Sequence, residues 1–173
     1  MPLTLASVAA RWPEVDLAAL RLPAPLENPP AWDVSILPML SPVASIGFPY
    51  GYDHENTSVT SRGFAGHSAG TNQYARLKGK PEVYEVTFAA PRGLSGAPLL
   101  RGDGIICGVI LGNFSTEMTV FSDRERVEER GEVTITERFE ALNLGIAVCA
   151  RTVLSLQLPT AERLLDFVLA AGA

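Results

Sequence analysis

The segment Gly93-Leu94-Ser95-Gly96-Ala97-Pro98 places a serine between two glycines. A glycine on each side lets the backbone turn sharply and leaves the serine hydroxyl unshielded by a bulky neighbour. The backbone amides of Gly93 and Ser95 can then point to one spot and hold a developing oxyanion. This is the local requirement for a serine nucleophile in acyl transfer, although an ordinary glycine-rich turn between two strands has the same pattern.

Strand-like segments flank this turn on both sides. Residues 84–89 (YEVTFA) precede it, and residues 105–112 (IICGVILG) follow it after a short turn at residues 101–104 (RGDG). Runs of β-branched and aromatic residues bounded by glycine-rich turns are typical of strands. The serine is therefore expected on a turn between two strands of an all-β domain.

Composition and charge narrow the class of protein. The chain has 173 residues, 47% of them hydrophobic, with 15 glycines and 13 prolines. One ordinary domain or two small barrels fit this length. The net charge of -5 provides no basic stripe for nucleic acid. No segment approaches the roughly 20 apolar residues of a membrane span, and residues 1–6 have no basic signal-peptide start. We therefore expect a cytoplasmic protein, unless a true N-terminus lies upstream.

The serine turn and its flanks resemble the trypsin-like (chymotrypsin-fold) serine peptidases. Their nucleophile lies in Gly-x-Ser-Gly-Gly-Pro-Leu, followed by a short hairpin and a Gly-Val-Ile-Gly-like strand. In this sequence Ala97 replaces the second glycine of that motif. Three more segments match in the family's order, namely residues 15–22 (VDLAALRL, the aspartate segment), 45–51 (SIGFPYG, the start of the second barrel) and 143–148 (NLGIAV, the closing strand).

The resemblance implies an all-β, trypsin-like double β-barrel, with the second barrel complete, the first only partial, and a helix at the C-terminus. In this scheme the segments are a remnant of the first barrel (1–22), a proline-rich linker (23–42), the second barrel (43–152) and the C-terminal helix (153–173). Proline donates no backbone amide, so the linker is expected to be extended. The helix is expected from Thr160, a residue type that caps helices.

An inserted hairpin is expected at about residues 114–140. Residues 117–121 (EMTVF) and 132–136 (EVTIT) alternate polar and apolar side chains, and the charged segment 122–131 separates them. The hairpin has two interpretations: a solvated hairpin without a role, or a clamp for a substrate or partner beside the cleft.

The resemblance also implies the catalytic roles. Ser95 would attack the scissile carbonyl, and the amides of Gly93 and Ser95 would form the oxyanion hole. Asp16 would orient the catalytic histidine. The implied substrate is a protein or peptide, and no metal or cofactor is implied.

The same resemblance places a primary specificity pocket. Its bottom would be Ala89, six residues before the serine, and its walls would be Leu111, Gly112, Asn113 and Gly145. None of these residues is charged, so we expect a neutral, small or apolar side chain at the cleaved residue.

The catalytic histidine of the family has no counterpart before Asp16. The chain's two histidines, His54 and His67, both follow the aspartate. A serine without a base is a poor nucleophile at neutral pH, so the chain as given is predicted to be inactive or nearly so. Three explanations stay open: a truncated peptidase, a noncatalytic pseudopeptidase that binds peptides or regulates, or a base from His54, His67 or a partner chain.

Three smaller expectations complete the sequence analysis. Leu94 stands where family members activated by cleavage have an aspartate, so the resemblance is closer to bacterial or intracellular relatives. Cys107 and Cys149 are expected as reduced core residues, with a disulfide as the alternative, and neither has zinc-site spacing. The two strands of the first-barrel remnant would expose an unpaired edge, which favours self-association.

Overall fold

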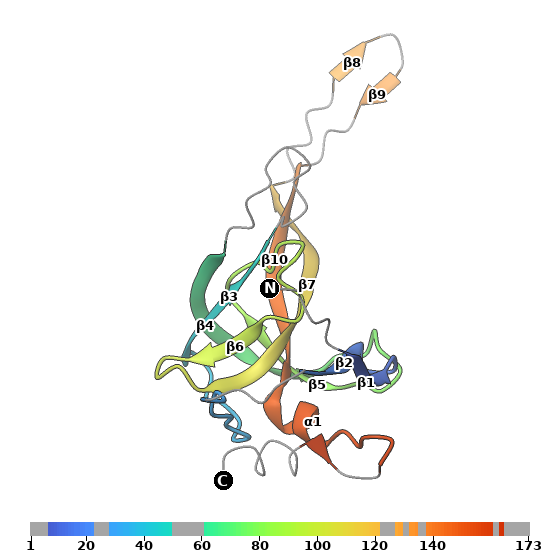
Figure 1. Cartoon of the computed structure of the whole chain (residues 1–173). Helices are drawn as coiled ribbons and strands as arrows, with labels where there is room; N and C mark the ends of the chain where they lie inside the picture. Colours follow the sequence, from blue (N-terminus) through green and yellow to red (C-terminus); the bar gives the residue numbers. More distant parts are fainter. Residues whose placement is uncertain are drawn as a thin grey trace.

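The computed structural model describes residues 7–22, 28–49, 61–121, 127–129, 132–134, 138–160 and 163–164. This part of the chain is mostly β, which confirms the expected fold class at that level (Figure 1). Six strands close into a barrel in the order β10-β5-β4-β3-β6-β7. They are β3 (Pro42–Gly47), β4 (Arg62–Gln73), β5 (Glu82–Val86), β6 (Pro98–Arg101), β7 (Ile106–Phe121) and β10 (Arg138–Cys149).

The barrel core follows from the period-two burial of its strands. In β3 the buried residues Val43 and Ser45 alternate with more exposed ones. The core cluster gathers inward side chains of several strands, among them Tyr84, Leu99, Cys107, Ile110 and Cys149, all with 0% exposure. At Gly108 a Cβ atom would lie 2.6 Å from the Val148 carbonyl oxygen, so glycine lets β7 and β10 approach closely.

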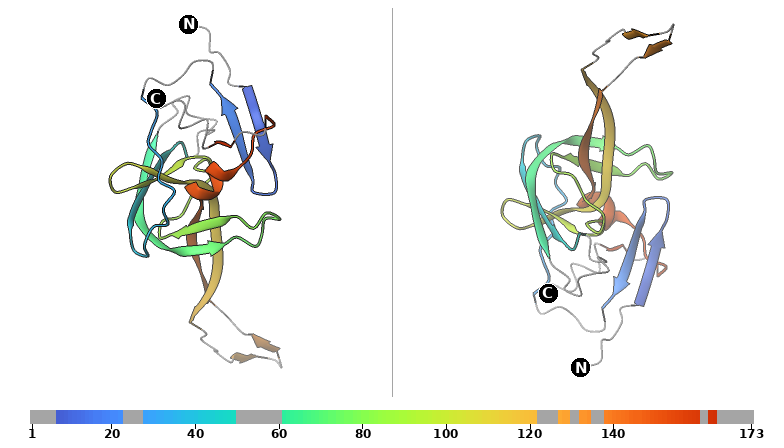
Figure 2. Two further views of the ribbon diagram at one scale, coloured as in Figure 1. Left: turned by 90° about the horizontal axis from the view of Figure 1, so that it is seen from below. Right: turned by 90° about the horizontal axis from the view of Figure 1, so that it is seen from above.

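A separate two-stranded hairpin stands beside the barrel, next to α1 (Ala150–Ser155) (Figure 2). Its strands are β1 (Ser7–Trp12) and β2 (Leu17–Arg21). The Gly79 amide donates to the Glu14 carbonyl at 2.8 Å, and the Trp12 indole donates to the Gln157 carbonyl at 3.0 Å. These bonds attach the hairpin to the β4–β5 turn and to the segment after α1.

The described residues contain one closed barrel. Within them, the β1–β2 hairpin is the only part that corresponds to the expected remnant of a first barrel. Large apolar side chains of this region are exposed, with Val8 48%, Leu20 60% and Leu22 50% accessible. The predicted self-association rests on such surfaces and stays a prediction.

The linker, in its described residues 28–41, lies along the barrel. Trp32 forms a parallel bridge with Ile106, whose carbonyl accepts from the Asp33 amide at 2.8 Å. Further along, the Leu40 amide donates to the Ser68 carbonyl at 2.7 Å. The proline-rich sequence therefore gives an extended segment without regular pairing, which single bonds hold in place.

The protruding hairpin is present as an outward extension of β7 and β10, with β8 (Val127–Glu129) and β9 (Glu132–Thr134) paired at its far end (Figure 1). The sequence pattern marks residues 117–121 and 132–136 as the two strands of this hairpin. In the structure the first of these segments pairs further along the chain, with Met118 opposite Glu140 and Phe121 opposite Arg138. The ladder begins in the barrel at Gly108 opposite Cys149 and continues outward, so the barrel sets the pairing.

The described helix also differs from the expected one. α1 spans Ala150–Ser155 and follows β10 directly, so it straddles the expected boundary between the second barrel (43–152) and the C-terminal helix (153–173). It buries Ala150, Val153 and Leu154, whereas Thr160 lies in a turn. Residues 161–162 and 165–173 of the predicted C-terminal helix lie outside the described residues. In the described part of the chain, no helix has the length and apolar character of a membrane span.

Candidate active site

The serine turn connects β5 to β6. Gly93 and Gly96 have φ angles of 93° and 89°, which favour glycine. The Leu94 amide donates to the Pro91 carbonyl at 3.0 Å, and the Gly96 amide donates to the Ile110 carbonyl at 2.8 Å. The Leu94 side chain has 0% exposure. A buried leucine thus anchors the turn in the core and leaves the next residue, Ser95, at the surface.

The hydroxyl and amides of this turn have different partners. Ser95 Oγ donates to the Leu111 carbonyl oxygen at 2.6 Å. The backbone amides of Gly93 and Ser95, in contrast, donate to no acceptor among the described residues. Two free amides, separated by one residue and beside an exposed hydroxyl, form a suitable setting for an oxyanion.

Ser95 and Asp16 line the same cavity, of about 650 Å³, between the β1–β2 hairpin and the barrel. We call it the hairpin cavity. Asp16 ends the turn between β1 and β2 and has a φ of 56°, a conformation that aspartate tolerates better than most residues. The remaining walls are mostly apolar and come from β1, β2, the linker, β7 and the region of α1, including Trp12, Leu17, Trp32, Leu111, Val153 and Leu164. The structure therefore brings two sequence-predicted catalytic residues to one cavity.

The predicted specificity pocket lies mostly elsewhere. Gly145 pairs with Asn113, and the Asn113 side-chain oxygen accepts from the Ala90 amide at 2.5 Å. The Gly145 amide donates to the Phe88 carbonyl at 2.9 Å, which brings the exposed Ala89 into the same neighbourhood. Gly112 lies next to Asn113 on β7 and pairs with Ile146. Of the five predicted residues, Leu111 alone lines the hairpin cavity.

No described histidine lines the hairpin cavity. His67 lies on β4 with an exposed side chain, and its backbone amide donates a hydrogen bond to Thr87 Oγ1 at 2.9 Å. His54 lies outside the described residues. The described residues also contain no cluster of three or more histidines, cysteines or carboxylates suited to a metal ion.

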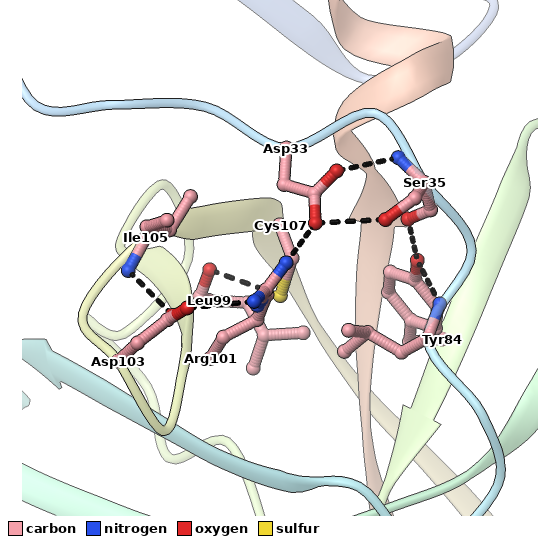
Figure 3. A network of polar contacts seen from close by, with 9 residues as sticks. Asp33, Ser35, Tyr84, Leu99, Arg101, Asp103, Ile105 and Cys107 are labelled. Atoms are coloured by element: carbon pink, nitrogen blue, oxygen red, sulfur yellow. Dashed lines mark hydrogen bonds and ion pairs between the residues drawn. The ribbon is translucent and has the colours of Figure 1, made fainter.

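A polar network fastens the linker to the barrel (Figure 3). Arg101 forms ion pairs with Asp33 and Asp103. Hydrogen bonds from the Ser35 hydroxyl and amide, together with Arg101, hold the pKa of Asp33 below its ordinary value. The Tyr84 hydroxyl donates to the Ser35 carbonyl at 3.2 Å and accepts from the Leu37 amide at 3.1 Å. This network fixes the linker immediately after Trp32, a wall of the hairpin cavity.

The two cysteines are free thiols in the core. Burial raises the pKa of Cys107 to about 11 and that of Cys149 to about 12. Both are therefore protonated at neutral pH and are poor nucleophiles. Of the candidates for a nucleophile in this region, Ser95 is the one at the surface.

Sequence reasoning missed the aromatic walls of the hairpin cavity. The chain has two tryptophans, and both line it. The sequence marks them only by their small number. It does not indicate that Trp12 of the hairpin and Trp32 of the linker line the same cavity.

No family model matches the chain, and no curated protein matches it by sequence. Its fold is similar to that of solved structures. Two crystal structures of Rv3671c from M. tuberculosis share it, one an inactive form of a serine-to-alanine mutant and the other the active form of the protease. The mutant has a TM-score of 0.56 and 17% identity over 86% of this chain and 60% of its own. The active form has a TM-score of 0.56 and 19% identity over 86% of this chain and 55% of its own. This chain thus spans less than two thirds of each neighbour.

Proposed function

We propose that this chain is a serine endopeptidase-like domain of the trypsin-like type, with Ser95 as the nucleophile toward a protein or peptide substrate. The observation that carries the proposal is the shared cavity. Ser95 from the β5–β6 turn and Asp16 from the hairpin turn line the same space. The protease fold of the structural neighbours supports this reading.

In the proposed reaction the Ser95 oxygen attacks the scissile carbonyl carbon, and the new oxyanion accepts hydrogen bonds from the Gly93 and Ser95 amides. Each such donor is worth on the order of 3 kcal/mol in acyl transfer. The serine proton must pass to a base, which then protonates the leaving amine. Asp16 would orient that base and stabilise its cationic form.

The proton transfer limits the rate. Ser95 Oγ donates to the Leu111 carbonyl oxygen, which is too weakly basic to take the proton. Because no described histidine lines the cavity, we expect at most slow acylation of Ser95 by an activated reagent and little turnover of peptides.

This same hydrogen bond favours a second candidate function, a noncatalytic module that binds or regulates peptides. In such a module the Ser95 hydroxyl is a structural group that caps the Leu111 carbonyl. A peptide would bind beside the serine turn through main-chain hydrogen bonds.

A fluorophosphonate probe separates the two functions. We expect slow covalent labelling of the native chain and none of Ser95→Ala. The matched control is Ser155→Ala, because Ser155 is exposed and also donates to a backbone carbonyl, that of Thr152 at 2.8 Å. Labelling that persists in Ser95→Ala rejects Ser95 as the nucleophile. Absent labelling, together with peptide binding that Ser95→Ala leaves unchanged, supports the noncatalytic module.

A further inference from the structure

The hairpin cavity has aromatic walls that acyl transfer does not require. Trp12 comes from β1 and Trp32 from the linker. The Trp12 indole is held by its hydrogen bond to the Gln157 carbonyl, and the Trp32 backbone is held by its bridge to Ile106. The Trp12 ring and the Trp32 backbone are therefore held in place by the protein itself.

Among the described residues that line this cavity, Asp16 has the only acidic or basic side chain. Within the described part of the chain, its carboxylate has no hydrogen-bond or ion-pair partner. A carboxylate at the edge of an apolar space gains most from a cation that enters with its own apolar stem. Tryptophan faces attract the same kind of group, since the ring quadrupole favours a cation above it.

We propose that the hairpin cavity binds an organic cation: a protonated nitrogen that pairs with Asp16, on an apolar stem that packs against Trp12 and Trp32. In a peptide this group is a lysine side chain. The inference rests on the proposed function only in treating the cavity as a substrate subsite. It concerns the Asp16 carboxylate while no base is paired with it, since no described histidine lines the cavity. That subsite is distinct from the neutral pocket expected around Ala89.

Tryptophan fluorescence provides a direct test, because both of the chain's tryptophans line the cavity. The probe is phenethylamine, and phenethyl alcohol is its neutral counterpart. We expect the amine to bind about ten-fold more tightly than the alcohol, in keeping with one ion pair and a cation–π contact. Replacement of Asp16 by asparagine, which tolerates the same backbone conformation, should remove this preference.

The matched control is Glu14→Gln, which removes a carboxylate from the same turn but outside the cavity lining. It should leave the amine preference intact. Equal binding of amine and alcohol to the native chain overturns the proposal, and so does an equal effect of Asp16→Asn and Glu14→Gln. Trp32→Leu offers an independent check, because it should weaken the amine more than the alcohol.

Two further measurements locate the source of the cation and separate this proposal from the previous one. A hexapeptide with one lysine should bind more tightly than its norleucine analogue. If the lysine peptide also binds more tightly than phenethylamine, the cation comes from a peptide. Fluorophosphonate labelling is measured on the same preparation, because it reports on Ser95 as a nucleophile and not on the cation site. Failure of cation binding with labelling intact therefore rejects the inference alone.

Discussion

The barrel and the β1–β2 hairpin contribute one side of the candidate site each, yet they are built differently. Every barrel strand pairs with a neighbour on both sides, because the sheet closes on itself. In the described part of the chain, each hairpin strand has one partner, and the buried residues of the hairpin cluster are Ala10, Trp12 and Val15. Two-stranded sheets are marginally stable unless they pack on something else. The Ser95 side of the site should therefore be rigid, and the Asp16 side only as stable as the hairpin's attachment.

That attachment is local and specific. The Glu14 carbonyl accepts from Gly79, and the Trp12 indole donates to Gln157. Leu17 and Leu164 each pack against both the hairpin cluster and the neighbouring cluster around Val148. Local opening of the hairpin would then separate Asp16 from Ser95 without unfolding the barrel. We therefore expect the barrel side of the site to be more stable than the hairpin side.

The largest effect is expected from Ile110→Ala, in the centre of the barrel. Ile110 has 0% exposure, and its backbone supports the serine turn on both sides, through the Gly96 and Ala97 bonds. We expect a loss of about 2–5 kcal/mol in the free energy of unfolding. Urea denaturation followed by fluorescence and circular dichroism measures it.

The control for this change is Ile46→Ala, since Ile46 is 55% exposed. It should alter stability by less than about 0.5 kcal/mol. Similar losses from both variants would mean that the barrel core is not the stable half of the molecule.

An intermediate effect is expected from Gly79→Ala, at the hairpin's attachment. The added Cβ would lie 2.7 Å from Val15 Cγ1 and 2.9 Å from the Glu14 carbonyl oxygen. The hairpin must shift away, which should lower the free energy of unfolding by about 1–3 kcal/mol. Hydrogen exchange should accelerate in β1 and β2 while barrel amides keep their protection, and phenethylamine affinity should fall.

Gly63→Ala is the matched control, because a Cβ there meets nothing within 4 Å. It should leave exchange in the hairpin unchanged. If Gly79→Ala accelerates exchange in the barrel as much as in the hairpin, the two regions form one cooperative unit, and the comparison fails.

The sequence predicted the barrel better than the cavity, for physical reasons. Short β-branched runs and glycine turns are local signals, so the strands around Ser95 and the serine turn itself could be predicted. The register of the protruding hairpin could not, because the distant pair Gly108 and Cys149 sets it. The meeting of Trp12 with Trp32 could not be predicted either. It depends on bonds between residues far apart in sequence, such as Trp12 to Gln157.

The helix shows the same limit. Capping and apolar spacing predicted a helix from Thr160, most of which lies outside the described residues, and gave no signal for α1, which begins at Ala150, directly after β10. Tertiary packing decides here, because Val153 and Leu154 are buried while the helix has no side-chain cap at its N-terminus.

The smallest effect concerns Asp33, which fastens the linker to the barrel beside Trp32. Hydrogen bonds from Ser35 and the Arg101 ion pair lower its pKa in the folded chain. A lowered folded pKa stabilises the fold at pH values above the ordinary aspartate range, and this contribution is lost as the pH falls through the folded value. Asp33→Asn should therefore cost stability at pH 7, by less than about 1 kcal/mol for so accessible a pair.

Urea denaturation of the native chain and Asp33→Asn from pH 7 down to pH 3 measures this difference. The gap should begin to narrow below about pH 4, because the Asp33 carboxylate of the unfolded chain is protonated first there, and it should close as the pH falls through the lower pKa of the folded chain. Ile46→Ala, which removes no ionisable group, is the comparison variant and should leave a nearly constant gap. A gap for Asp33→Asn that does not depend on pH would show that the Asp33 charge does not hold the linker. The barrel would then secure Trp32 through the Ile106 backbone bonds alone, and the aromatic wall of the cavity would survive acid as well as the barrel does.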